Sequence, residues 1–377
     1  MKQKRYSAIE LFAGIGGFRL ACDKLSINTI WANDIDSKAV KVYKDNFGEE
    51  SIVQGDINSL IDAVPHHDIL TGGFPCQPFS KAGKKQGVDD IRGTLFEAIV
   101  KIVKLRQPKY FVLENVNSLL FMEGGRHYRT ILSALSDLDY KLEWRVLNAT
   151  EFGLPQHRER VIIIGSKDRA TNESYFLTDE DFSKFNVEQI DKIAKYEYWE
   201  DIIKSGKIFS QWGMAYKGKF VTFSINGYAK SNVCLNDILQ DEVPDSYDFT
   251  EDTLLRIENS VYVNKYYNGV QILYNQRGGA RMGYSIFGTN GLSPTLTAST
   301  SRHYERYKVN ERYRRLTNIE YARLQGFPDL HCKAVSPYDQ YKLYGNAVPH
   351  QLVHYALSQV VNEKYITLIS PLLNLFD

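Results

Sequence analysis

The chain has 377 residues, of which 43% are hydrophobic and 24% charged, and 46 Lys and Arg stand against 45 Asp and Glu. These are ordinary values for a folded globular protein, so they exclude a disordered chain, and no apolar run is long enough to predict a membrane-spanning segment. The length suggests two domains, and the formal charge of +1 means that a polyanion would have to be attracted by local charge.

The four cysteines, Cys22, Cys76, Cys234 and Cys332, are widely separated in the chain. Their spacing is typical neither of a disulfide framework nor of the paired cysteines of a zinc site. The first residues lead directly into a strand-like stretch without the pattern of a secretory signal. We therefore expect a protein without a metal in a reducing, cytoplasmic location.

From Tyr6 to about Lys167, short apolar runs alternate with longer amphipathic segments. This alternation predicts strands that are joined by crossover helices in a mostly parallel, doubly wound sheet, which is the α/β class. The predicted strands are residues 7–11, 29–32, 69–70, 110–113 and 160–165. The predicted helices are residues 18–25, 38–46, 94–105 and 128–138.

A glycine-rich turn, residues 11–18, follows the first predicted strand. A cofactor can approach the backbone of such a turn. Arg19 stands where the dinucleotide fingerprint needs its third glycine, which disfavours a nicotinamide cofactor. Asp34 and Asp56 are placed where carboxylates accept hydrogen bonds from ribose hydroxyls and an adenine amino group. Together these signals favour an adenosyl group, although a structural turn and a helix-capping Asp34 are the simpler explanations of the separate features.

The segment 72–80 holds Cys76 between two prolines, just past a predicted strand. Prolines restrict the local backbone and therefore the position of the thiol. A free thiol has a pKa of about 8.5, so a nucleophilic Cys76 needs an exposed, electropositive surrounding. The alternative is a buried cysteine in a tight turn.

Glu114 ends an apolar predicted strand, and apolar flanks raise a carboxyl pKa so that the group can donate a proton near neutral pH. Its alternative is a capping or salt-bridged glutamate. Gln156, Arg158 and Arg160 alternate along one face where the last strand begins. Arginine offers planar donors for a base carbonyl or a phosphate, although an edge strand with solvated charges explains the pattern equally well.

After Ser166 the sequence becomes rich in Tyr, Asn, Ser and Lys, which indicates a second module. Residues 235–252, here called the acidic segment, hold seven acids and no Lys or Arg, so we expect a solvated outer face. Residues 302–315, the basic segment, hold six basic residues and interleaved tyrosines, which predicts phosphate contacts or a solvated charge run. Thr317 and Glu320 have the spacing of a capping box.

The ordered motifs Phe-Ala-Gly-x-Gly-Gly, Pro-Cys-Gln-Pro-Phe-Ser, Glu-Asn-Val and Gln-x-Arg-x-Arg, followed by residues 341–349, resemble the DNA (cytosine-5-)-methyltransferase family. Bacterial modification enzymes are the most similar members, and the resemblance covers about residues 1–167 and 293–350. It implies the S-adenosylmethionine-dependent methyltransferase fold with a smaller, irregular, β-rich target-recognition domain. Residues 1–185 plus 334–377 would form the catalytic domain, and residues 186–333 the target-recognition domain.

The resemblance also implies roles for particular residues. The expected catalytic set is Cys76 as nucleophile, Glu114 as acid, and Arg158 and Arg160. The expected contacts of S-adenosyl-L-methionine are Phe12, Gly14, Gly16, Gly17, Asp34, Ile35, Asp56, Ile57, Pro75, Leu95, Asn346 and Ala347. The expected DNA contacts are Gln77, Ser80, Lys84, Arg92, Gln156, Arg277 and Arg281, with Gln276 and Asn290 as further candidates for reading bases.

The chemistry fits these side chains, because a thiolate that attacks carbon 6 of cytosine makes carbon 5 able to accept a methyl group. A base inside a duplex cannot present its face to a thiolate, so base flipping is required. The basic, glycine-bearing residues 80–88 are expected to close over the extruded base.

The expected partner is double-stranded DNA. We expect the protein to be a monomer and not to associate with a membrane. A cognate restriction endonuclease that acts on the same site without direct contact is a further candidate. The alternatives are a tRNA cytosine-5 methyltransferase, whose usual Cys-Phe-Thr tripeptide is absent, a catalytically silent DNA-binding relative, and a nicotinamide oxidoreductase.

Overall fold

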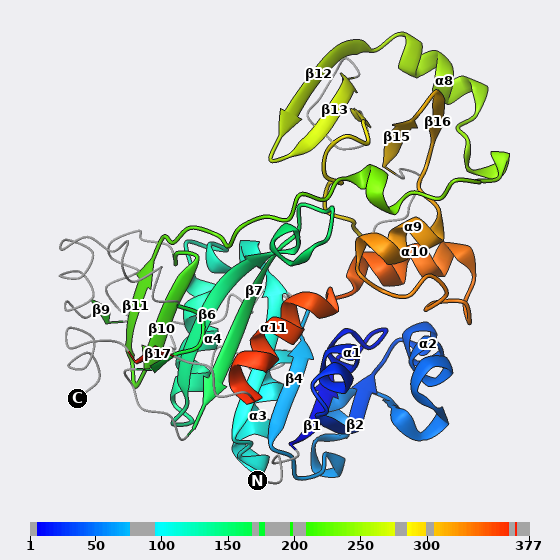
Figure 1. Ribbon diagram of the computed structural model, residues 1–377. Helices are drawn as coiled ribbons and strands as arrows, with labels where there is room; N and C mark the ends of the chain where they lie inside the picture. The colour runs from blue at the N-terminus through cyan, green and yellow to red at the C-terminus, as the bar shows by residue number, and fades with distance from the viewer. Residues whose placement is uncertain are drawn as a thin grey trace.

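The computed structural model describes residues 6–75, 95–167, 173–177, 197–198, 209–275, 285–298, 305–361 and 366–367. Figure 1 shows a large unit built on one long sheet and a smaller unit above it. The helices are α1 (Gly17–Lys24), α2 (Ser37–Phe47), α3 (Leu95–Arg106), α4 (Arg126–Ser136), α8 (Glu251–Glu258), α9 (Asn318–Leu324), α10 (Pro337–Asn346) and α11 (His350–Val361).

The strands of the large unit form a ten-stranded sheet in the order β3-β2-β1-β4-β5-β7-β6-β10-β11-β9. They are β1 (Ser7–Leu11), β2 (Asn28–Asp34), β3 (Val53–Gln54), β4 (Ile69–Gly73), β5 (Tyr110–Val116), β6 (Lys141–Asn148), β7 (Glu159–Ser166), β9 (Glu197–Tyr198), β10 (Trp212–Tyr216) and β11 (Lys219–Phe223). The first five strands in the sheet order are parallel, whereas β7 pairs antiparallel with β5, and the antiparallel pattern continues to the other edge. The predicted α/β fold is confirmed, and its parallel part ends at β5.

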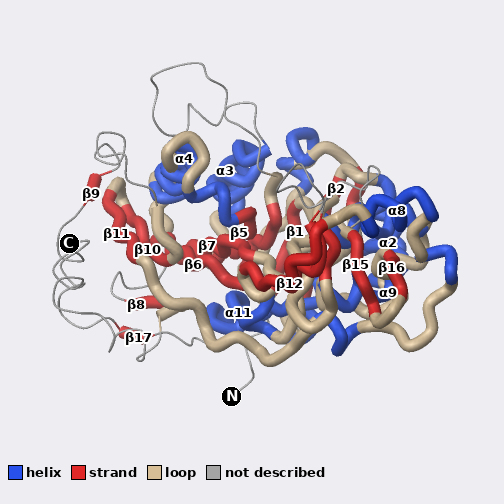
Figure 2. Tube along the Cα trace, turned by 90° about the horizontal axis from the view of Figure 1, so that it is seen from above, coloured by secondary structure: helices blue, strands red, loops and turns tan. Residues whose placement is uncertain are grey.

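Alternate residues of the central strands pack into two separate cores, as a period of two requires. In β5, Phe111 and Leu113 pack in the core that includes α3 and α4, whereas Tyr110 and Val112 pack in the core that includes α1 and α11. Figure 2 shows α3 and α4 on one side of the sheet and α11 on the other. The sheet is therefore covered on both faces, which leaves the ends of its strands as the place for a site.

The second module is predicted to begin at residue 186, but in the structure the chain still belongs to the main sheet at residue 223. Strand β10 pairs with β6, and β11 pairs with β10, so residues 212–223 extend the main sheet. Gly213 lies under the ring of Trp144, where an added Cβ would be 2.2 Å from the ring, and this close packing fixes the position of β10. The main sheet thus includes part of the chain that the sequence assigned to target recognition.

The smaller unit is built on a five-stranded sheet with the order β12-β13-β14-β15-β16. Its strands are β12 (Val261–Tyr267), β13 (Val270–Asn275), β14 (Ser285–Phe287), β15 (Arg306–Val309) and β16 (Arg312–Arg314). Helix α9 begins with the predicted capping box, in which Thr317 and Glu320 satisfy each other's backbone N–H groups. Helix α10 packs against α9, whereas α11 returns to the large unit and packs against α1. A two-stranded sheet of β8 (Glu173–Ser174) and β17 (Ile366–Thr367) completes the described strands.

None of the helices in the described parts of the chain has the length and apolar character needed to cross a lipid bilayer.

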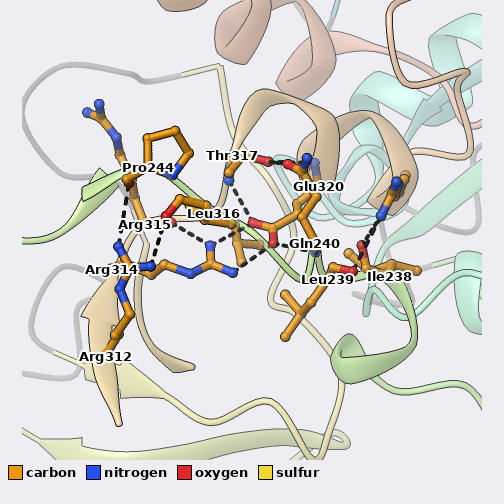
Figure 3. A network of polar contacts seen from close by, with 12 residues as sticks. Ile238, Leu239, Gln240, Pro244, Arg312, Arg314, Arg315, Leu316, Thr317 and Glu320 are labelled. Carbon is orange, nitrogen blue, oxygen red and sulfur yellow. Dashed lines mark hydrogen bonds and ion pairs between the residues drawn. The ribbon is translucent and has the colours of Figure 1, made fainter. Parts of the chain in front are cut away.

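The acidic segment and the basic segment contact each other in the smaller unit (Figure 3). Nη2 of Arg312 lies 2.8 Å from Oδ1 of Asp248 and 3.2 Å from Oδ1 of Asp245. The guanidinium of Arg315 lies 5.1 Å from the ring centroid of Tyr247. All seven acids of the acidic segment are nevertheless exposed, as expected for an outer face.

A buried ion pair stands at the centre of the same network (Figure 3). Arg314 donates from both Nη atoms to the carboxylate of Glu320, at 2.7 and 2.8 Å, and both side chains are almost fully buried. The carboxylate also accepts from the backbone N–H groups of Gln240 and Thr317. Arg314 is thus buried with a partner within the chain, so the predicted phosphate contacts of the basic segment do not extend to it, whereas Arg312 is partly exposed beside Asp245 and Asp248.

Candidate active site

A cavity of about 600 Å³ lies at the C-terminal ends of β1, β2, β4 and β5. This is where open α/β sheets bind ligands, and residues 295–297 and 343–348 form its opposite wall. The predicted site residues that line the cavity are Phe12, Gly14, Gly17, Asp34, Ile35, Pro75, Leu95, Glu114, Arg158, Arg160, Asn346 and Ala347.

Asp34 fixes the backbone on one side of the cavity. Its Oδ2 accepts from the N–H of Gly14 at 2.7 Å, and its Oδ1 accepts from the N–H of Asp36 at 2.8 Å. Burial raises the pKa of this carboxyl, and the backbone donors partly oppose that shift. Each carboxylate oxygen has a second lone pair, so Asp34 can still accept from the hydroxyls of a ligand.

The two adjacent glycines of the turn have different surroundings. Gly16 has φ 88°, and an added Cβ would lie 2.4 Å from the ring of Phe47, so it supports the turn and does not line the cavity. At Gly17, an added Cβ would lie 2.5 Å from the carbonyl oxygen of Val348. Glycine at this position therefore allows the start of α1 to touch the C-terminal wall of the cavity.

Arg158 holds that wall in place. Its Nη1 donates to the carbonyl of Leu296 at 3.0 Å, and its Nη2 donates to the carbonyls of Gly345 and Ala347 at 3.1 and 2.8 Å. The side chain is 1% exposed. Arg158 is predicted in the catalytic set, and in this structure its three bonds go to backbone carbonyls, two of which belong to the residues before and after the exposed Asn346.

Glu114 and Arg160 form an ion pair in the cavity wall. Strands β5 and β7 are neighbours, and Nε of Arg160 lies 2.8 Å from Oε1 of Glu114. Burial raises the pKa of Glu114, and the guanidinium groups of Arg160 and Arg158 oppose this shift without cancelling it. Glycine at position 73 leaves space for the carboxylate of Glu114, because an added Cβ would lie 2.9 Å from its Oε2. The site thus combines a carboxyl with a raised pKa and a fixed cation.

Two of the other cavity-lining residues, which the sequence did not identify as functional, are buried polar residues with specific partners. Glu10 accepts from the N–H of Phe18 at 3.1 Å and from the hydroxyl of Tyr43 at 2.9 Å, and burial raises its pKa to about 8. Asn115 donates to the carbonyl of Phe74 at 2.9 Å. The signal that could have found them is a polar residue inside an otherwise apolar strand, which is unusual unless the residue has a specific partner.

Besides Gly16, three further predicted contacts lie outside the cavity. Asp56 is exposed and accepts from the N–H of Asn58, so it caps a short helical turn, and Ile57 is buried in the core. The side chain of Gln156 is fully buried, because it donates to the carbonyl of Leu324 and accepts from the N–H of Leu296. In this structure Gln156 therefore connects the two units and has no surface with which to contact DNA.

The remaining predicted residues fall outside the described parts of the chain. They are Cys76, Gln77, Ser80, Lys84, Arg92, Gln276, Arg277 and Arg281. The expected closing segment, residues 80–88, belongs to the same group. Asn290 is described, and its Oδ1 accepts from Nδ2 of Asn236 at 2.9 Å.

Comparisons with known proteins agree with this geometry. The family model of the C-5 cytosine-specific DNA methylase matches residues 6–362. The type II methyltransferase M1.ScrFI of Lactococcus lactis subsp. cremoris is 33% identical over 94% of this chain and 77% of the relative, and M.HaeII of Haemophilus aegyptius is 32% identical over 95% and 94%. The solved structure of S. pombe Dnmt2 methyltransferase matches the fold with a TM-score of 0.62, at 19% identity, over 95% of this chain and 99% of that chain.

Proposed function

The chain belongs to the C-5 cytosine-specific DNA methylase family, and from this premise we propose that it methylates a flipped-out cytosine within one short duplex DNA sequence. Family membership makes it a DNA (cytosine-5-)-methyltransferase that uses S-adenosyl-L-methionine. The covalent adduct through Cys76, the sequence specificity and the place in a restriction-modification system are our proposals. The observation that carries the adduct is the Glu114–Arg160 pair, which lies in the same cavity as Pro75, the residue before Cys76.

The residues at the ends of β1 and β2 fit the cofactor. Asp34 has lone pairs left for the ribose hydroxyls, and Ile35 is 68% exposed at the cavity, which offers an apolar surface for a planar base. Asn346 supplies a polar side chain from the opposite wall. When bound, S-adenosyl-L-methionine supplies a methyl group on a sulfonium. The predicted contact of Asp56 with its adenine and the predicted cofactor contact of Ile57 remain proposals.

We propose that the thiolate of Cys76 bonds to carbon 6 of the cytosine. Glu114 donates its proton to ring nitrogen 3, so that negative charge does not build up in the ring. Arg160 stabilises the base through its planar donors. Carbon 5 then takes the methyl group and loses its own proton to a base. The bond between Cys76 and carbon 6 breaks, and its electron pair returns to sulfur. The proton on nitrogen 3 returns to Glu114.

We further propose that duplex DNA lies between the two units and that the protein acts as a monomer in the cytoplasm. Residues 80–88 would close over the flipped base, with Gln77, Ser80, Lys84 and Arg92 near the DNA. Arg277 and Arg281 are proposed to contact DNA from the smaller unit. A restriction endonuclease that cuts the same sequence would complete the system, because the named relatives are type II methyltransferases.

The test is to express the wild type, Cys76→Ala and Cys234→Ala in a host without cytosine methylation and to map 5-methylcytosine across its genome. Cys234 is a matched control, because it is a free thiol outside the cavity. We expect methylation at one short motif with the wild type and Cys234→Ala, and none with Cys76→Ala. Methylation by Cys76→Ala would refute the covalent mechanism. Methylation by none of the three would refute the proposed substrate, and labelled cofactor with tRNA would then test the RNA alternative.

A further inference from the structure

His331 joins the connection between α9 and α10 to the glycine-rich turn of the cavity. Its Nε2 lies 2.7 Å from the carbonyl oxygen of Ile15 and donates to it, since a carbonyl can only accept. Both residues are 2% exposed. Burial lowers the pKa of His331, so its ring is neutral at about pH 7 and carries its single proton on Nε2. The turn before α1 is therefore held by a side chain that comes 316 residues later in the chain.

The bond fixes the orientation of the peptide group between Ile15 and Gly16. The carbonyl of this group accepts from His331, and its N–H donates to the carbonyl of Ala13 at 2.9 Å. No other donor reaches the Ile15 carbonyl among the residues that the structure describes. Gly16 has φ 88° and no side chain to limit rotation, so the two bonds supply the constraint. A buried carbonyl without a partner is costly, so loss of the His331 donor would let this peptide group turn toward another donor.

The ring of His331 is itself held by its surroundings. Its centroid lies 4.8 Å from that of Phe327 and 6.1 Å from that of Phe47. The carbonyl of His331 accepts from Nδ2 of Asn46 at 2.8 Å, which attaches the connection to α2 (Figure 1). The ring of Phe47 also fills the space beside Gly16. Neither His331 nor Phe47 lines the cavity, so both support the turn from outside it.

The turn forms part of the cavity wall where the cofactor is proposed to bind. Its cavity-lining residues are Ala13, Gly14, Ile15 and Gly17. Asp34 holds the first part of the turn through the N–H of Gly14, and His331 holds the next part through the carbonyl of Ile15. The two side chains thus fix adjacent residues of the same wall, one from inside the cavity and one from outside it.

We propose that His331 is a positioning residue for S-adenosyl-L-methionine: by holding the Ile15 carbonyl, it keeps the glycine-rich turn in the shape that receives the cofactor. This inference rests on the proposed cofactor site at the ends of β1 and β2. It assigns His331 to cofactor binding and not to the chemistry on the base, because its bond acts on the turn and not on the Glu114–Arg160 pair.

The test compares His331→Phe and His331→Gln with the wild type. Phenylalanine keeps an aromatic ring between Phe327 and Phe47 but has no donor. Glutamine keeps the donor, because its amide nitrogen is as many bonds from Cα as Nε2 of histidine is. The matched control is His67→Phe, because His67 is also buried and its Nδ1 donates to a backbone carbonyl, that of Pro65 at 2.8 Å, outside the cavity.

All four proteins are measured for the Kd of S-adenosyl-L-methionine by calorimetry without DNA, for the urea midpoint without cofactor, and for kcat and cofactor KM on a duplex with the mapped target. We expect His331→Phe to raise the cofactor Kd and KM together, by roughly 5- to 50-fold, with kcat at saturating cofactor within about twofold of the wild type. His331→Gln should bring the Kd back to within about threefold of the wild type, and His67→Phe should leave it unchanged.

A wild-type cofactor Kd in a folded His331→Phe would overturn the inference and leave the proposed function standing. Equal rises of the Kd in His331→Phe and His331→Gln would also overturn it, because the shape of the ring and not its donor would then matter. Failure of His331→Phe to fold would assign His331 to overall stability and would likewise overturn the inference. A wild type that binds no S-adenosyl-L-methionine would instead refute the proposed cofactor site itself.

Discussion

Nη2 of Arg158 lies 2.8 Å from the carbonyl oxygen of Ala347, so a side chain from the residue just before β7 holds a segment that comes 189 residues later in the chain. The same Nη2 donates to the carbonyl of Gly345. The two bonded carbonyls belong to the residues on either side of Asn346. Arg158 therefore ties the C-terminal wall of the cavity to the segment that leads into β7, the strand that carries Arg160.

Arg158→Lys should weaken cofactor binding more than it slows the chemistry. A lysine ammonium cannot span three carbonyls as the planar guanidinium does, and each charged hydrogen bond contributes about 1.5–3 kcal/mol. We expect the cofactor Kd to rise by roughly 10- to 100-fold in calorimetry, with a smaller fall in kcat at saturating cofactor. Arg256→Lys, at an exposed pair with Asp252, is the control. A variant with wild-type cofactor affinity would show that Asn346 does not need this support.

Glu114→Gln should lower kcat by about 10²- to 10⁴-fold without loss of cofactor binding, because an amide cannot supply the proton. The pH dependence follows from the raised pKa of Glu114, which burial causes. The protonated, active form is lost as the pH rises through that pKa, so the wild-type kcat should decline on the alkaline side. Single-turnover rates from about pH 6 to 9 test this, and an identical alkaline decline in Glu114→Gln would assign it to another group.

Glu10→Gln should change the pH dependence of stability. Burial raises the pKa of Glu10 to about 8, whereas the unfolded chain has the ordinary value of 4.5. Between these values the folded state binds more protons than the unfolded state, so the free energy of unfolding falls as the pH rises. The glutamine variant should lose this decline, which urea unfolding at about pH 5 and pH 8 measures. Exposed Glu49→Gln should keep the wild-type slope, and the same slope in Glu10→Gln would contradict the prediction.

Removing Arg314 should destabilise the smaller unit far more than removing Arg312. Arg314→Met leaves the buried carboxylate of Glu320 without its cation, which costs about 3–5 kcal/mol. Arg312 is partly exposed, so Arg312→Met should cost less than about 1 kcal/mol. Urea unfolding gives both values, and equal losses for the two variants would refute this ranking.

Strands and helices with a regular apolar pattern were predictable from the sequence. The prediction of residues 7–11 matches β1, and residues 110–113 and 160–165 lie within β5 and β7. Strand β6 was missed, because Glu143 and Arg145 give it a polar pattern although both are buried. Their partners come from distant segments, since Glu143 accepts from Nε1 of Trp212 and Arg145 donates to the carbonyl of Phe176.

In the candidate site too, residues identified by short motifs were predictable, whereas bonds between residues far apart in the sequence were not. Asp34 and Glu114 stand at strand ends, and short motifs were enough to place them near the cavity. The bonds of Arg158 and Gln156 were not predictable, because they join residues more than a hundred positions apart. Glu10 has a raised pKa because the folded structure buries it, and the bonds from Tyr43 and the N–H of Phe18 partly oppose this rise.

The packing of α11 against α1 has a consequence for the order of events on the ribosome. Lys24, at the end of α1, contacts His350, at the start of α11, across 326 residues. At about 5–20 residues per second, roughly 15–65 seconds separate the synthesis of these two helices. During this time the apolar face of α1 lacks its cover and the cavity lacks residues 343–348. The cavity is therefore complete only after these last segments have emerged from the ribosome.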